Sequence, residues 1–243
     1  MAANRLWQAL GRWPWVVLVT VMLGASGPIL LAEGKPAAGT TLGGRVIVVD
    51  PGHGGVDGGA YHNSAAEKDI VLGVSLELGR LLTQAGARVI YTREGDYDLS
   101  GLGPDAGLRE RLLADLKRRA GIGNGPGVDV FLSVHANEFP SPYWHGSQVF
   151  YNARGHPDSR RLALRIQQEL VRIAGYTERE INEQVEVYLM EQVRVPIVTV
   201  ELGFMSNPDE LRRLRDRDYQ RRLAWAVFVG TAKYFAEGPF QQR

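Results

Sequence analysis

Cysteine is absent from this 243-residue chain, and neither sign of charge dominates it. Without cysteine there is no disulfide, no thiolate zinc ligand and no cysteine nucleophile, so a metal site must use histidine, aspartate or glutamate. The 28 basic and 27 acidic residues are interspersed and leave a formal net charge of +1. The chain therefore lacks the basic surface that is typical of nucleic-acid binding, and we expect no nucleic-acid partner.

Long apolar runs are missing after residue 32, but one precedes it. Residues 1–12 carry Arg5 and Arg12 and form a basic segment, whereas residues 13–32 carry no charge. This order predicts a cleaved signal peptide or an uncleaved membrane anchor, with a buried helix of the domain as the third alternative. The basic residues favour an exported, extracytoplasmic domain that meets the membrane through this segment. We expect residues 33–44, which are rich in small residues and proline, to be a linker, and residues 239–243 to be a tail.

The alternation of apolar and amphipathic segments predicts an α/β fold. Hydrophobic residues make up 44% of the chain, and residues 45–238 are long enough for one domain. We expect a single three-layer domain with a mostly parallel central sheet of about six strands, helices on both faces and a metal site at the strand ends. The predicted strands are 46–50, 88–92, 130–135, 147–152 and 197–201, and the predicted helices are 68–85, 108–120, 157–173, 219–235 and a short one after Asn207.

A histidine follows the first predicted strand. The β-branched run 46–49 ends at Pro51 and Gly52, and His53 comes next in a turn that contains further glycines. A histidine with space around it suits a metal ion that keeps one position free for water and substrate. The same residue is equally consistent with a solvated turn histidine. A phosphate-binding loop is less consistent, because the spaced glycines and the Lys-Ser/Thr pair of such loops are missing.

Three more residues lie at comparable ends of predicted elements. Glu67 stands at the start of the first long helix, where a carboxylate also interacts favourably with the helix N-terminus. His135 and Glu201 each end a predicted apolar strand, although His135 is also consistent with a satisfied core histidine. Two histidines and one glutamate from this set would hold one Zn²⁺ ion, and the second glutamate would be free for proton transfer.

Six short motifs occur in a specific order along the domain. They are Asp50-Pro51-Gly52-His53-Gly54-Gly55, Gly58-Gly59-Ala60, Glu67-Lys68, Thr92-Arg93, Ser133-Val134-His135-Ala136-Asn137 and Glu201-Leu202-Gly203-Phe204-Met205-Ser206-Asn207. Together they resemble the zinc-dependent N-acetylmuramoyl-L-alanine amidases (amidase type 3) over about residues 45–237. Within that family the chain is most similar to the germination-specific spore-cortex amidases.

The resemblance implies a site and a reaction. His53, Glu67 and His135 would be the zinc ligands and Glu201 the catalytic glutamate, and Asn137 and Arg93 are candidate substrate contacts. The expected reaction is hydrolysis of the amide between the lactyl group of muramic acid and L-alanine of peptidoglycan stem peptides. Zinc would lower the pKa of its water from about 15.7 toward roughly 7. The chain departs from the family at Glu138, where a small residue is common, and at Asn63, where glycine is common.

The resemblance also implies a place for the reaction. The enzyme would act in the cell wall or the forespore intermembrane space, in spore-cortex maturation through muramic δ-lactam formation and in germination. An activating lipoprotein and a downstream muramic acid deacetylase are the expected partners beside peptidoglycan. The alternatives are a general cell-wall autolysin for cell separation or turnover, and a wall-binding scaffold without activity.

Overall fold

The computed structural model describes residues 41–238. The predicted basic segment 1–12, the signal or anchor segment 13–32, most of the linker and the tail lie outside the described residues. No helix in the described part of the chain combines the length and the apolarity needed to cross a membrane.

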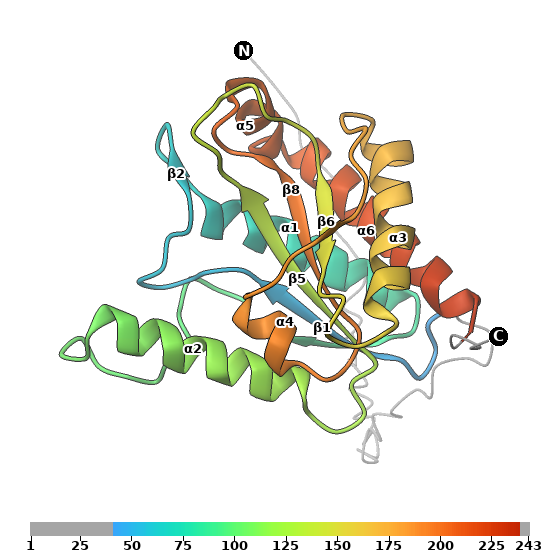
Figure 1. Cartoon of the computed structure of the whole chain (residues 1–243), viewed down its shortest axis with the longest axis horizontal. Coiled ribbons are helices and arrows are strands. Elements are labelled where there is room, and N and C mark those ends of the chain that lie inside the picture. The colour runs from blue at the N-terminus through green and yellow to red at the C-terminus, as the bar shows by residue number, and fades with distance from the viewer. Residues whose placement is uncertain (1–40, 239–243) are drawn as a thin grey trace, which may run out of the picture. The chain divides into compact units, whose positions relative to one another are not determined.

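A six-stranded sheet forms the centre of the domain (Figure 1). Its order is β4 (Arg88–Tyr91), β1 (Val46–Pro51), β5 (Val130–Asn137), β8 (Ile197–Phe204), β6 (Gln148–Tyr151) and β7 (Asn182–Glu183). All neighbours are parallel except β6 and β8, which pair antiparallel. A separate hairpin, β2 (Tyr61–His62) with β3 (Ala65–Ala66), precedes the first helix. The predicted sheet, with about six mostly parallel strands, is confirmed.

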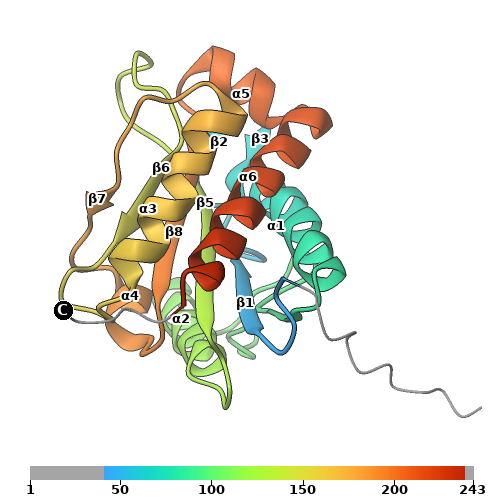
Figure 2. The same ribbon diagram turned by 90° about the vertical axis from the view of Figure 1, so that its right-hand side faces the viewer.

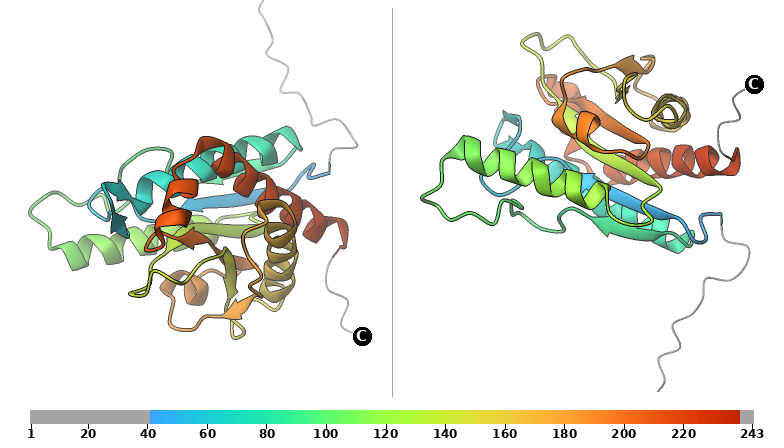
Figure 3. Two further views of the ribbon diagram at one scale, coloured as in Figure 1. Left: turned by 90° about the horizontal axis from the view of Figure 1, so that it is seen from above. Right: turned by 60° about the horizontal axis from the view of Figure 1, so that its bottom comes forward.

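Helices cover both faces of this sheet. One face packs against α1 (Glu67–Gln84), α3 (Ser159–Glu169) and α6 (Arg217–Ala236), which lie together in Figure 2. The other face packs against α2 (Leu108–Gly123) and α4 (Tyr188–Gln192) (Figure 3). Successive residues of β1 alternate between the two cores: Ile47 and Val49 face the first, and Val48 faces the second. Burial on both faces explains the uninterrupted β-branched run of this strand.

Strands β5 and β8 run further than the sequence predicts. The predicted ends were His135 and Glu201, but β5 continues to Asn137 and β8 to Phe204. The two strands stay paired there, with His135 opposite Glu201 and a register shift before Asn137 meets Phe204. Because this pairing continues, His135 and Glu201 lie next to each other inside the paired part of the two strands and not at the strand ends.

Two other expectations need correction. The turn 41–44 was expected to end a linker, yet Leu42 is fully buried in the core and its backbone N–H donates to Ala85 O at 3.0 Å. The expected single helix 157–173 is α3 followed by a π-helical turn, Leu170–Ala174, which Gly175 ends with φ 72°. The short helix α5 (Pro208–Leu214) forms as predicted, and the Asn207 side chain caps it by accepting from two backbone N–H groups.

Candidate metal centre and active site

A buried carboxylate anchors the end of β1. Asp50 is fully buried and accepts hydrogen bonds from Thr92 Oγ1, Ser133 Oγ and Arg119 Nη1, each at 2.6 Å. Burial alone would raise the pKa of Asp50, but the Arg119 guanidinium and the hydroxyl donors hold it below its ordinary value. These contacts tie β4, β5 and α2 to β1, and they fix the start of the turn that carries His53.

The turn after β1 has an unusual backbone. His53 itself adopts φ 61°, a left-handed conformation that costs a residue with a side chain about 1–2 kcal/mol. Arg119 Nη2 holds it by donating to His53 O at 2.6 Å. A Cβ atom on Gly52 would overlap the ring of His135, and one on Gly59 would overlap Glu67 and His53. The glycines therefore make room for the neighbouring candidate ligands.

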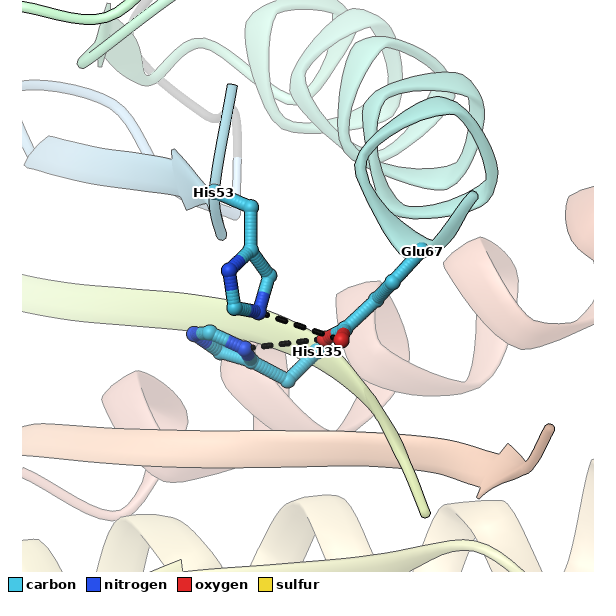
Figure 4. Close-up of side chains that lie close together, drawn as sticks. All are labelled: His53, Glu67 and His135. Carbon is cyan, nitrogen blue, oxygen red and sulfur yellow. Dashed lines mark hydrogen bonds and ion pairs between the residues drawn. The ribbon is translucent and has the colours of Figure 1, made fainter. Parts of the chain in front are cut away.

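Three side chains converge at this turn (Figure 4). His53 Nε2 lies 3.1 Å from Glu67 Oε2, and His135 Nδ1 lies 3.0 Å from Glu67 Oε1. One ligand atom from each residue lies within 4.8 Å of the other two. Glu67 is the first residue of α1 and is almost fully buried, and its two oxygens also accept from the backbone N–H groups of Ala60 and Ala136 at 2.9 Å.

The donor set fits a zinc ion. Two imidazole nitrogens and one carboxylate leave one tetrahedral position for water or substrate, which is the ligand pattern of catalytic zinc. Burial would lower the pKa of His53, but Asp57 and Glu67 raise it to about 10. Burial would likewise raise the pKa of Glu67, but His135 and His53 hold it well below its usual range. Both shifts come from the close pairing of carboxylates with imidazoles, and a bound metal ion would take the place of the proton on His53.

Asp57 contacts the ring nitrogen of His53 that faces away from Glu67. The sequence did not identify Asp57 as a site residue. His53 Nδ1 lies 2.8 Å from Asp57 Oδ2, which leaves Nε2 directed at Glu67. The other Asp57 oxygen accepts from Gly59 N at 3.1 Å. A carboxylate on the distal nitrogen of a ligating histidine sets its tautomer and orientation. The available signal was an aspartate four residues after the histidine, inside the same glycine-rich turn.

Glu201 lies beside this cluster with a free acceptor. It pairs in register with His135, and its Oε2 atom is buried with no hydrogen-bond partner among the described residues. Burial raises the pKa of Glu201 to about 7. A carboxyl group that loses and regains a proton near neutral pH is suited to general acid–base catalysis.

Two adjoining hollows open over these residues, between α2 and α4. A hollow of about 160 Å³ is lined by His53 and Asp57, and a hollow of about 260 Å³ is lined by Glu201. Both share His135, Leu116 and Leu189. The two candidate histidine ligands and the Glu201 carboxylate therefore line one cleft.

The predicted substrate contacts differ in how they are placed. Arg93 is 1% exposed, and its guanidinium donates to four carbonyl oxygens, those of Pro51, Gly52, Lys68 and Gly95. It braces the loop from inside, which does not fit the predicted contact with substrate. Asn137 is half-buried at the end of β5, and its contact with substrate stays a prediction.

The two departures from the family pattern are accommodated locally. Asn63 adopts the left-handed conformation, φ 46°, that a glycine would supply. Glu138 pairs with His62, whose Nε2 lies 2.6 Å from Glu138 Oε1, so it links the β2–β3 hairpin to the loop after β5.

Comparisons with known proteins identify the family of this chain. The family model described as N-acetylmuramoyl-L-alanine amidase matches residues 47–233. The germination-specific N-acetylmuramoyl-L-alanine amidase of Bacillus subtilis is 38% identical over 196 residues, covering 81% of this chain and 82% of that protein. The N-acetylmuramoyl-L-alanine amidase LytC of Bacillus subtilis is 30% identical over 193 residues, covering 79% of this chain and 36% of that protein.

A solved structure extends the likeness to three dimensions. The CwlD amidase from Clostridioides difficile, solved in complex with the GerS lipoprotein, superposes with a TM-score of 0.76 at 36% sequence identity. The superposition covers 79% of this chain and 99% of that one.

Proposed function

The chain belongs to the N-acetylmuramoyl-L-alanine amidase family, and we propose that it uses one zinc ion held by His53, Glu67 and His135. It is a hydrolase that acts on peptidoglycan, and the bond cleaved joins the lactyl group of muramic acid to L-alanine of the stem peptide. The observation that carries the zinc assignment is the convergence of three donor atoms within 4.8 Å of one another. Glu201, whose buried Oε2 finds no partner in residues 41–238, is the residue we assign to proton transfer.

The bound zinc would supply a Lewis acid that acidifies water and polarises the scissile carbonyl. The chain's own residues do the rest. Asp57 holds the His53 ring so that Nε2 faces the cluster. Glu201 accepts the proton of the attacking water and returns it to the departing alanine nitrogen, a role that suits a carboxylate whose Oε2 has no hydrogen-bond partner among the described residues.

The biological setting is the finer part of the proposal. We place the enzyme outside the cytoplasm, in spore-cortex maturation by muramic δ-lactam formation and in germination. A deacetylase would act after it. The supporting observation is the 38% identity to a germination-specific amidase, over 82% of that protein's length. A lipoprotein partner is proposed because the CwlD amidase was solved together with one.

Mass spectrometry of digested peptidoglycan tests the reaction. The full chain with stoichiometric zinc should release stem peptides that begin with L-alanine, chelation should stop the release and zinc should restore it. Glu201→Gln should keep zinc and lose at least about a hundredfold in rate, because general acid–base catalysis contributes 10²–10⁴-fold. Glu191→Gln, the same change at an exposed position of α4, is the matched control.

The outcomes separate the proposal from its alternatives. Full activity of Glu201→Gln would remove its catalytic role, and zinc binding without peptide release would favour the wall-binding scaffold. Activity that appears only after the lipoprotein is added would support a partnered enzyme. Cortex from a deletion strain should lack muramic lactam, whereas normal lactam together with a defect in cell separation would favour the general autolysin.

A further inference from the structure

Two residues that line the same hollow each carry a buried oxygen atom that finds no hydrogen-bond donor among the described residues. One is Glu201 Oε2, already assigned to proton transfer, and the other is Gln184 Oε1. Both atoms are acceptors, so neither satisfies the other unless a proton lies between them. A buried acceptor left unpaired costs about 1–3 kcal/mol, and a ligand that brings N–H donors removes that cost.

The walls of this hollow indicate which part of the substrate enters it. Apart from Glu201 and Gln184, the hollow is lined on one side by Leu116 of α2 and by Val187, Tyr188 and Leu189. Three residues of the sheet, Ser133, His135 and Thr199, line its other side. Largely apolar walls with a few polar groups suit a peptide, which offers regularly spaced N–H groups and a small methyl side chain. They suit a sugar ring less well, because its hydroxyl groups would face apolar carbon.

The direction of the reaction gives an independent reason. Glu201 returns its proton to the nitrogen that departs with the peptide, so the peptide must extend from the Glu201 side of the cleft. The neighbouring hollow is lined by His53 and Asp57 and does not include Glu201. That hollow is left for the acyl side of the scissile bond, which carries the lactyl group and the glycan.

The segment that carries Gln184 is held in place by its backbone. Gln184 N donates to Tyr151 O at 2.9 Å, directly after β7. Glu186 then adopts φ 63°, a conformation that costs a residue with a side chain about 1–2 kcal/mol. Gln184 and Val187, on either side of Glu186, line one hollow.

From these observations the geometry points to Gln184 as a substrate-binding residue: the stem peptide lies in the hollow between Leu116 and Leu189, and Gln184 Oε1 accepts the backbone N–H of the residue that follows L-alanine. The methyl group of L-alanine contacts the aliphatic walls. This inference rests on the proposed amidase reaction and adds the orientation of its substrate in the cleft.

Synthetic substrates test the contact directly. The pair is an N-acetylmuramoyl-L-alanyl peptide and the same compound methylated at the nitrogen of its second residue. Gln184→Leu, which keeps the volume and removes the acceptor, should raise KM on the first compound about five- to tenfold with kcat within about twofold. Methylation of the substrate should raise the KM of the wild-type protein by a similar factor. It should not raise the KM of Gln184→Leu any further, because the substitution and the methylation remove the same hydrogen bond.

A matched control and a binding measurement complete the design. Gln192→Leu makes the same change at an exposed glutamine of α4 that does not line the hollow, and it should behave as wild type. An unchanged KM in Gln184→Leu, or equal losses on both compounds, would overturn the inference. Calorimetry with the free stem peptide separates this result from a failure of the proposed reaction. If Gln184→Leu weakens peptide binding and no variant hydrolyses the substrate, the proposed reaction is wrong and the contact between Gln184 and the peptide is supported.

Discussion

At the scale of single residues, the site depends on the buried carboxylate of Asp50. Asp50 accepts hydrogen bonds from Thr92, which follows β4, from Ser133 of β5 and from Arg119 of α2. Arg119 also donates to the backbone of His53. The pair of Asp50 and Arg119 is 1–2% exposed. A buried ion pair is weak evidence for stability by itself, but removing one partner leaves the other uncompensated. The contacts of Asp50 therefore control the turn that presents His53.

Asp50→Asn should lower the free energy of unfolding by about 3 kcal/mol, because Arg119 would keep only Asp115 as its charged partner. Urea unfolding at pH 7 measures it. Asp209→Asn, which removes an exposed partner of Arg212, should change stability by less than about 0.5 kcal/mol. Equal effects of the two substitutions would contradict a special role for Asp50.

The same carboxylate predicts a pH dependence. Its pKa in the folded protein lies below the ordinary value of 3.8, so its contribution is complete above that pH. The contribution is lost as the pH falls below 3.8 toward the folded pKa, since the unfolded chain then binds the proton first. Stability of the wild-type protein should drop more steeply than that of Asp50→Asn in this acid range, in the same urea titration. Parallel curves would argue against the assignment.

The sequence identified some site residues and missed others for a physical reason. His53, Glu67, His135 and Glu201 were recognisable because each follows or begins a strongly patterned element. Asp57 and Gln184 lie in segments without periodicity, so no pattern assigned them a direction. Their roles depend on the atoms around them. Asp57 lies against His53 Nδ1, and Gln184 Oε1 has no hydrogen-bond donor among the described residues. Arg93 belongs to one of the six motifs and was a candidate substrate contact, whereas its buried guanidinium donates to backbone carbonyl oxygens.

At the scale of elements, hydrogen bonding between strands sets the strand ends that the hydrophobic pattern does not define. The apolar runs predicted five of the six strands of the sheet, but β5 and β8 outlast their apolar runs because each continues to find hydrogen bonds on the other. The two-residue strand β7 has no pattern of its own and exists by pairing with β6. The register of this pairing matters for function, since it places His135 opposite Glu201.

Glycine in helices offers a prediction with opposite signs at two positions. In α6, a Cβ atom on Gly230 would lie 2.5 Å from Ile166 Cα of α3, so Gly230→Ala should destabilise the fold by about 1–3 kcal/mol. In α2, nothing lies within 4 Å of the same atom on Gly121, so Gly121→Ala should stabilise by about 0.5–1 kcal/mol. Thermal unfolding compares them. A stabilising Gly230→Ala would mean that α3 and α6 do not approach so closely.

At the scale of the whole molecule, the site joins parts that are distant in sequence. The cleft needs the turn after β1, the start of α1, the inner ends of β5 and β8, one side of α2 and the segment before α4. No single stretch contains it, so a resemblance spread over six motifs was a stronger signal than any one histidine. The same arrangement predicts that ligand binding at the cleft stabilises the entire fold, because the ligands are assembled only when these parts are in place.

Zinc should therefore raise the melting temperature of the full chain. A ligand that binds only the folded state adds about 2.7 kcal/mol at a hundredfold excess over its Kd, which corresponds to a shift of about 5–10 °C for a domain of this size. His135→Ala should abolish the shift, because it removes one of three proposed ligands. Glu201→Gln should retain it, because Glu201 is assigned to proton transfer and not to the metal. Scanning calorimetry with and without zinc measures all three proteins. A shift that survives His135→Ala, or one that disappears with Glu201→Gln, would move the ion away from the cluster in which His53, Glu67 and His135 meet.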